Sequence, residues 1–235
     1  EQATELYKAF VQGDCVVTNA RTAEMTKLTE NSCRDVQIAF ANELSIICDK
    51  LDIDVWELIS LANRHPRINI LKPGPGVGGH CIAVDPWFIV SKTPEQAKLI
   101  HTARTVNDLK PQWVIDKVKL ALADFLQANI NKTVKDVTIA FLGLAFKADI
   151  DDLRESPALN ITKNICNEFS GTILAVEPNV DFLPSSLINK AELTDLKNAL
   201  DRSDIIVLLV PHKEFSDLRI DSKKSVVDTV GIYAP

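Results

Sequence analysis

The sequence is poor in the cysteine patterns that mark disulfide-rich and zinc proteins. It has five cysteines, an odd number, and no two of them form a CxxC pair. Neither a disulfide framework nor a zinc site is therefore indicated, and we expect no metal. This cysteine usage is typical of a reducing compartment, so we expect a cytoplasmic protein.

Long apolar runs and basic clusters are also missing. No run approaches the about 20 apolar residues of a membrane span, and no charged and then apolar leader opens the chain. The 32 acidic residues outnumber the 26 lysines and arginines, and the longest basic cluster is Lys223-Lys224. We therefore expect neither a membrane nor a nucleic acid as partner.

The start of the chain lacks the signs of a complete domain. The only methionine is Met25, and no GxGxxG motif follows a predicted strand. Residues 2–11 predict a helix that Gly13 ends, and residues 15–17 predict a short buried strand. A helix and a strand with nothing before them are typical of the last unit of a parallel sheet. We expect the sequence to be part of a longer chain.

A glycine-rich stretch organises the middle of the chain, where residues 73–86 read PGPGVGGHCIAVDP. Four glycines and two prolines precede Cys81, and Asp85 follows four residues later. Glycines this dense are typical of backbone at positive φ or pressed against a ligand. A connector with an inert buried cysteine is the alternative, since structural cysteines outnumber reactive ones. We interpret the stretch as a loop and a candidate site.

Helical periodicity surrounds this loop on both sides. Residues 22–49 predict a long helix, and Asp54 caps a second helix that runs to residue 63. After the loop, residues 87–90 read as an apolar turn. A third helix begins at the capping box of Thr93, bends at Pro111 and continues to Phe125.

One face of the first long helix is polar and carries Glu24, Lys27, Asn31 and Arg34 at spacings of three and four. A solvated stripe is the ordinary interpretation of such a face.

The last hundred residues have a different period. Residues 129–135 are a polar linker, after which short apolar strands alternate with helices. Strands are predicted at 137–142, 172–176, 204–210 and 225–228, and helices at 156–169 and 194–200. This order predicts a parallel, doubly wound sheet, so the fold class is α/β with an all-α segment before it.

Parallel sheets bind ligands beyond the carboxyl ends of their strands. This rule places residues 143–155, GLAFKADIDDLRE, at the binding edge of the first strand. Lys147 and Arg154 are there either to meet an anion or to lie in solvent.

Two reaction classes fit the residues around Cys81. One is a thiol hydrolase, and the other is an oxidation in which the thiolate traps an aldehyde as a thiohemiacetal. Adjacent His80 points away from Cys81 on an extended chain, so a hydrolase would draw its base from His65, His101 or His212. The oxidation needs a nicotinamide cofactor, for which this sequence has no phosphate-binding motif after a strand.

Three segments together resemble the UDP-glucose/GDP-mannose dehydrogenase family, over essentially the whole chain. PGPGVGGHCIAVDPWF resembles its catalytic cysteine loop, AEMTKLTEN its helix that brings a lysine and an asparagine into the site, and GLAFKADIDDLRESPA a loop of its nucleotide-sugar domain. The resemblance implies oxidation of the C6 hydroxyl of a UDP-N-acetyl-hexosamine to a carboxylate, with two hydride transfers to NAD. The product would serve bacterial surface polysaccharide synthesis.

The resemblance also implies roles for single residues. Cys81 is the implied nucleophile, forming the thiohemiacetal and then the thioester. Lys27 stabilises the oxyanion, Asn31 helps to hold it or a water, and Asp85 assists proton transfer.

Other residues are implied to bind ligands. Arg67 would reach the substrate of a neighbouring subunit, Lys147 would contact the nucleotide sugar, and Arg154 would contact the cofactor or a diphosphate. The remaining implied substrate-binding residues are Gly76, Gly78, Gly79, His80 and Phe146.

The resemblance divides the chain into three parts. Residues 1–20 would be the end of an NAD-binding domain, 21–128 a helical dimerisation domain, and 129–235 a UDP-sugar-binding domain. A homodimer is implied. Because the main NAD-binding domain is absent from this sequence, we expect the printed chain alone to be inactive.

Two further functions stay open from the sequence. The GGHC form of the loop favours the N-acetylmannosamine sugar, but UDP-N-acetylglucosamine is an alternative substrate. The second open function is that of a non-catalytic module for nucleotide-sugar binding and dimerisation.

Overall fold

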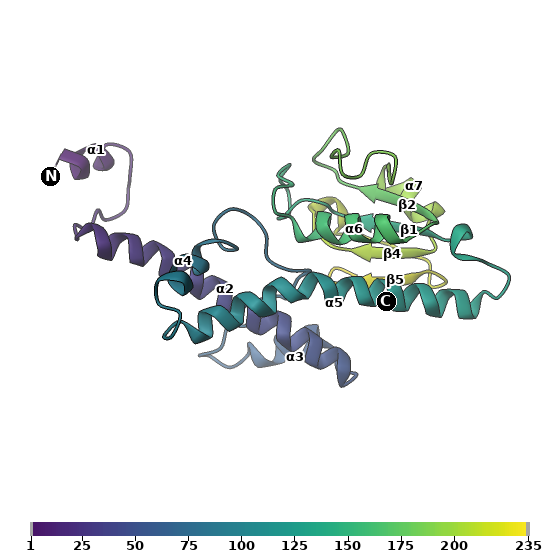
Figure 1. Cartoon of the computed structure of the whole chain (residues 1–235), viewed down its shortest axis with the longest axis horizontal. Coiled ribbons are helices and arrows are strands. Elements are labelled where there is room, and N and C mark those ends of the chain that lie inside the picture. The colour runs from purple at the N-terminus through teal and green to yellow at the C-terminus, as the bar shows by residue number, and fades with distance from the viewer. Residues whose placement is uncertain (1, 234–235) are drawn as a thin grey trace.

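The computed structural model describes residues 2–233 and shows a helical half and an α/β half joined by one long helix (Figure 1). The helical half comprises α1 (Gln2–Lys8), α2 (Ala20–Lys50), α3 (Val55–Ala62), α4 (Asp85–Lys92) and the amino-terminal part of α5 (Lys98–Ala128). The helices predicted at 22–49 and 54–63 are confirmed as α2 and α3. Within the described residues, none of the helices has both the length and the apolar character needed to cross a membrane.

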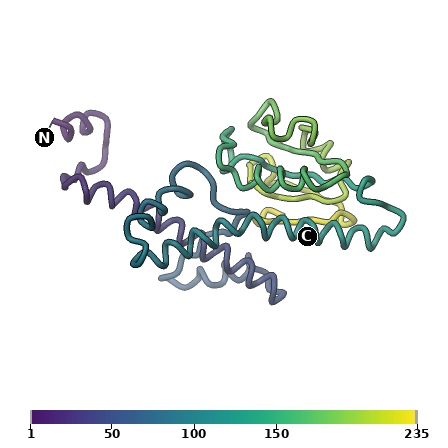
Figure 2. The backbone as a smooth tube through the Cα atoms, viewed as in Figure 1, coloured from purple at the N-terminus to yellow at the C-terminus, as the bar shows by residue number. Residues whose placement is uncertain are grey.

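The strand predicted at residues 15–17 is wrong. The segment is irregular, and the side chains of Val16 and Val17 are largely exposed. Figure 2 shows this segment at the opposite end of the molecule from the sheet. A strand needs a neighbour to pair its backbone groups, and none of the described residues pairs with 15–17, so the apolar run alone does not form one.

The region after the glycine-rich loop also differs from prediction. Residues 87–90 are not a turn but part of α4, which has Pro86 in its first turn, where the missing N–H of proline is harmless. The helix predicted from Thr93 begins only at Lys98, because residues 93–97 form a separate turn. That helix, α5, continues through Pro111 without a break.

The faces along which α2 and α5 pack on each other are polar. Asp35 and Asn42 of α2 are fully buried, whereas Met25, Phe40 and Ile47 of its apolar stripe are each about half exposed. The periodicity predicted the helix but not which side faces inward. The reason is that apolar spacing does not distinguish a helix face that packs in the chain's own core from an apolar face that stays exposed.

The α/β half contains a five-stranded parallel sheet of order β3-β2-β1-β4-β5. The strands are β1 (Thr138–Leu142), β2 (Thr172–Val176), β3 (Glu192–Leu193), β4 (Ile205–Leu208) and β5 (Ser225–Asp228), and the helices are α6 (Pro157–Glu168) and α7 (Leu196–Arg202). The predicted doubly wound α/β fold is confirmed. Strand β3 was missed because two residues, one of them an exposed glutamate, form no apolar run.

Both faces of the sheet are covered. The carboxyl-terminal part of α5 packs with α6 on one face, where Val114 and Val118 join Ile139 and Val207 in a buried core. Helix α7 covers the other face. Helix α5 therefore belongs to both halves and fixes the helical layer relative to the sheet (Figure 1).

Candidate active site at the junction of the two halves

The glycine loop, residues 73–81, is pressed against the α/β half. A Cβ atom added to Gly78 would lie 2.4 Å from the carbonyl oxygen of Glu155. Gly79 has φ +84°, and a Cβ there would lie 2.9 Å from the ring of Phe146. These two glycines are therefore required by close packing of the loop on the segment that follows β1.

Gly76 serves the same packing on the helical side of the junction. It has φ +148°, and a Cβ there would lie 3.0 Å from the side chains of Pro111 and Pro157. The loop thus contacts α5 and the start of α6 at one point.

The structure brings three of the predicted catalytic residues to one place. Cys81 is exposed and lies one turn before Asp85, whose backbone N–H donates to the Cys81 carbonyl oxygen at 2.8 Å. The amide Nδ2 of Asn31, from α2, donates to Asp85 Oδ2 at 2.5 Å. This bond joins α2 to the first turn of α4, four residues after the cysteine in the chain.

Lys27 lies one turn before Asn31 on α2 but is not part of this bond. Its side chain is 64% exposed, and its ammonium pairs with Glu30 at 3.2 Å. An exposed pair of this kind is worth less than about 1 kcal/mol, so the lysine is free to change partner.

His80 and Arg154 meet at a shared carboxylate. His80 Nε2 lies 3.6 Å from Asp152 Oδ2, while Arg154 donates to both oxygens of Asp152, at 2.9 Å and 2.7 Å. The hydrogen bonds from Arg154 hold the pKa of Asp152 well below its usual range. Any anion that binds Arg154 must therefore compete with an existing bidentate pair.

The other predicted binding side chains are exposed. Lys147 and Arg67 project from loops, and the backbone N–H of Arg67 donates to His65 Nδ1 at 3.3 Å. Phe146, beside Lys147, is half-buried against the glycine loop.

A buried glutamate and histidine hold both ends of the segment that carries Phe146 and Lys147. Glu177 Oε2 accepts hydrogen bonds from the backbone N–H groups of Leu144 and Ala145, at 2.7 Å and 2.9 Å. It also lies 3.1 Å from His212 Nε2. Burial by itself raises the pKa of Glu177, but the hydrogen bonds of His212 and of the amides outweigh burial and leave the pKa lowered.

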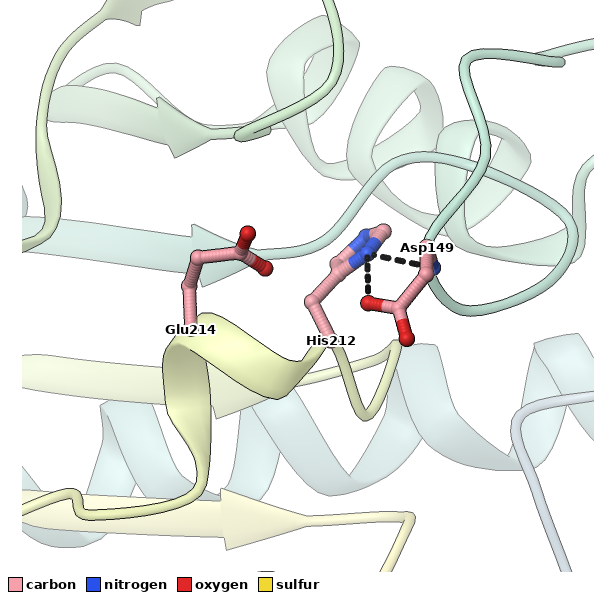
Figure 3. A group of neighbouring side chains, drawn as sticks. All are labelled: Asp149, His212 and Glu214. Carbon is pink, nitrogen blue, oxygen red and sulfur yellow. Dashed lines mark hydrogen bonds and ion pairs between the residues drawn. The ribbon is translucent and has the colours of Figure 1, made fainter.

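Asp149, His212 and Glu214 form a group that resembles a metal site (Figure 3). The ring nitrogen on this side is Nδ1, which accepts the backbone N–H of Asp149 at 3.0 Å. A backbone N–H only donates, so the ring proton sits on Nε2 and is donated to Glu177. The lone pair of Nδ1 is thus already used, and we interpret the group as a fastening of the 144–149 segment.

Sequence reasoning missed a buried polar network between α2 and α5. Arg104 Nη1 donates to Asp35 Oδ1 at 2.6 Å, and Nη2 of the same side chain pairs with Asp108. Asn107 Nδ2 donates to Asp35 Oδ1 at 2.8 Å, and Asn42 Nδ2 donates to Asn107 Oδ1 at 2.9 Å. Burial raises the pKa of Asp35 despite its partners.

The available signal was the helical spacing of these polar residues. Asp35 and Asn42 are two turns apart on α2, and Arg104 and Asn107 are one turn apart on α5. Such spacing shows a shared face but not that the face is buried.

The sequence matches two models of one protein family. The profile of the UDP-glucose/GDP-mannose dehydrogenase family, central domain, matches residues 21–109, and that of its UDP binding domain matches residues 140–235. The two matches together span most of the chain. The chain belongs to this family.

Individual relatives agree with this assignment. The chain is 60% identical to a UDP-N-acetyl-D-mannosamine dehydrogenase of Yersinia pestis, over 99% of this chain and 56% of the relative. It is 57% identical to an NDP-N-acetyl-D-galactosaminuronic acid dehydrogenase of Ralstonia nicotianae, over 100% of this chain and 53% of the relative. The chain thus spans about half the length of the curated relatives it matches.

A solved structure shares the fold. The UDP-D-ManNAc dehydrogenase of Pyrococcus horikoshii superposes with a TM-score of 0.83 at 35% identity, over 99% of this chain and 54% of that one. The arrangement of helical layer, long helix and parallel sheet is therefore that of a known dehydrogenase.

Proposed function

We propose that this chain forms the catalytic-cysteine and UDP-sugar-binding parts of an NAD-dependent UDP-N-acetyl-D-mannosamine 6-dehydrogenase. One observation carries the proposal: the loop that ends at exposed Cys81 packs on the segment carrying Phe146 and Lys147. A nucleophile and a nucleotide-sugar site are thus joined at one junction, in a chain about 60% identical to enzymes of that name.

The chemistry assigned to Cys81 follows from its exposure. The Cys81 thiolate adds to the C6 aldehyde, forming a C–S bond while the carbonyl electrons move to oxygen. Lys27, freed from its exposed pair with Glu30, and Asn31 stabilise that oxygen. Once the adduct is oxidised to a thioester, water adds to the carbonyl, the C–S bond breaks and Cys81 leaves as thiolate.

Asp85 is the group we assign to the hydrolytic water. Its Oδ2 is held by Asn31 at 2.5 Å, which fixes the carboxylate and leaves Oδ1 to accept a proton from water. A fixed carboxylate one turn from the thioester suits this role.

The substrate residues follow the same junction. We assign Lys147 to the diphosphate or sugar, and Phe146, His80 and the backbone of Gly76, Gly78 and Gly79 to the substrate wall. Arg67 is assigned to the substrate of a second subunit. Residues 21–128 and 129–235 are then the dimerisation and UDP-sugar domains, and 1–20 the end of the NAD-binding domain.

When bound, NAD would supply the oxidising power, with two NAD molecules in turn each accepting one hydride from C6, and water would supply the second carboxylate oxygen. Residues 2–233 do not fit a dinucleotide site of the usual type. The segment between β1 and α6 has one glycine, Gly143, and the first turn of α6 is capped by its own Ser156, which accepts the N–H of Leu159. Arg154 stays our only candidate toward the cofactor, and it is already paired with Asp152.

A homodimer is proposed from the exposed stripe of α2. Met25, Phe40 and Ile47 are about half exposed on a helix whose buried inner side carries polar residues such as Asp35 and Asn42. Burial of such a stripe against a second copy removes apolar surface from water. A reducing, cytoplasmic location fits the unpaired thiol of Cys81.

The decisive experiment replaces Cys81 by alanine in the protein at its natural full length. We expect formation of the uronate from UDP-N-acetylmannosamine to fall by at least about 1,000-fold, because the aldehyde is no longer trapped. Cys33→Ala, at an exposed cysteine on α2, is the matched control. Uronate formation that survives Cys81→Ala would instead support a non-catalytic binding module.

UDP-N-acetylgalactosamine is a second candidate substrate, because the Ralstonia relative is named for a sugar acid derived from N-acetylgalactosamine. Turnover of the UDP-linked N-acetylmannosamine, N-acetylglucosamine and N-acetylgalactosamine substrates, side by side, decides among the three. We expect the first to be the best.

A further inference from the structure

The glycine loop has one backbone donor at its start. Pro73 and Pro75 have no N–H, so Gly74 alone can donate a hydrogen bond within residues 73–75. The Gly74 N–H donates to Asn42 Oδ1 at 2.9 Å. The other end of the loop is fixed independently, by the packing of Gly78 and Gly79 on Phe146.

Asn42 is held so that it presents an acceptor to this donor. It is fully buried, and its Nδ2 donates to Asn107 Oδ1 at 2.9 Å. Asn107 in turn donates to Asp35, which is paired with Arg104. Because every amide nitrogen in this series donates away from the loop, the oxygen of Asn42 can only face Gly74.

We propose that Asn42 is a positioning residue for the glycine loop, which ends at Cys81. Its bond to Gly74 transmits the rigid α2–α5 network to the segment that ends at the nucleophile. Asn31, from the same helix, fixes Asp85 on the far side of Cys81. Helix α2 therefore holds the cysteine segment before and after the thiol. The catalytic consequence rests on the function proposed above, but the structural one does not.

The first test measures amide hydrogen exchange in the protein at its natural full length. Asn42→Ala removes the acceptor, and we expect exchange of the Gly74 N–H to accelerate about tenfold or more, while α2 and α5 keep their protection. Ser32→Ala is the control, since Ser32 is buried on the same helix but bonds only the Leu28 carbonyl. Unchanged exchange of the Gly74 N–H, or an equal acceleration throughout α2, would overturn the proposal.

A paired substitution separates positioning from simple loss of stability. Asn42→Asp alone sets a second acceptor against Asn107 Oδ1. Asn42→Asp with Asp35→Asn lets the two bonds through the Asn107 amide reverse, keeps an acceptor at residue 42 for the Gly74 N–H, and keeps the net charge. We expect the double variant to slow loop exchange again relative to Asn42→Asp. A double variant whose loop exchanges as fast as that of Asn42→Asp contradicts the proposal.

The catalytic arm uses the natural full-length protein. We expect Asn42→Ala to lower kcat for uronate formation at least fivefold with little change in KM, because the Cys81 position changes and the Lys147 side does not. Equal kcat with accelerated loop exchange would refute the catalytic consequence. No turnover in the unsubstituted protein would refute the proposed function, while the exchange result would still stand.

Discussion

The glycine loop and the 143–155 segment meet at the same junction but are anchored by different chemistry. The glycine loop is fastened by a neutral amide, Asn42, whereas the second segment is fastened by a buried carboxylate, Glu177, and a neutral histidine, His212. An amide anchor is indifferent to pH, and a carboxylate anchor is not. Two loops that meet at one junction can therefore lose their anchors under different conditions.

The largest effect is expected at the carboxylate anchor. Glu177→Ala leaves the amides of Leu144 and Ala145 and the ring N–H of His212 buried without an acceptor. We expect the free energy of unfolding to fall by about 3 kcal/mol or more. Urea unfolding measures this loss. Glu192→Ala, at an exposed glutamate paired with Arg202, should change it by less than about 1 kcal/mol; equal losses in the two variants would contradict the anchor.

The contact between the two loops comes next. Gly78→Ala drives a methyl group against the carbonyl oxygen of Glu155, a backbone atom with little room to move. We expect a loss of about 1–3 kcal/mol of stability, measured by thermal unfolding. Gly74→Ala is the matched control, because nothing lies within 4 Å of the added Cβ. A Gly78 variant as stable as the Gly74 variant would show that the two loops do not pack as described.

Alkaline pH should change the free energy of unfolding through Lys110, on the helical side of the junction. Burial lowers the pKa of Lys110 to about 7, although nearby Asp49 opposes the shift. Between pH 7 and the usual lysine range the unfolded chain then binds more protons, so the free energy of unfolding rises with pH, by at most about 1.4 kcal/mol per unit. Lys110→Met should flatten this rise in urea unfolding measured at pH 7, 8 and 9, whereas an unchanged slope would exclude Lys110 as its source.

Acid should lower the free energy of unfolding through Glu177, on the sheet side of the junction, and this is the smallest expected effect. The pKa of Glu177 is lowered in the folded chain, so its stabilisation is complete above the usual glutamate range and is lost as pH falls through the folded pKa. Glu177→Gln should reduce the acid dependence of the free energy of unfolding. Asn42→Ala, at the amide anchor, should leave that dependence unchanged, and an equal change in both variants would remove the contrast between the anchors.

The sequence by itself determined the elements and the residues of interest. Apolar spacing predicted α2, α3 and the parallel sheet, because the residues that an element buries recur with the period of that element. The glycine, cysteine and aspartate residues of 73–86 identified the candidate site, because few other structures need that composition.

Only the tertiary structure decided which faces are buried and what the glycines contact. Asp35 and Asn42 lie at helical spacing like any solvated stripe, and their burial depends on partners about seventy residues away on α5. Gly78 and Gly79 are required by Phe146 and Glu155, which the sequence places in the other half. The strand predicted at 15–17 was wrong for the same physical reason: a local pattern specifies a conformation only when a neighbour is present to bury or pair it.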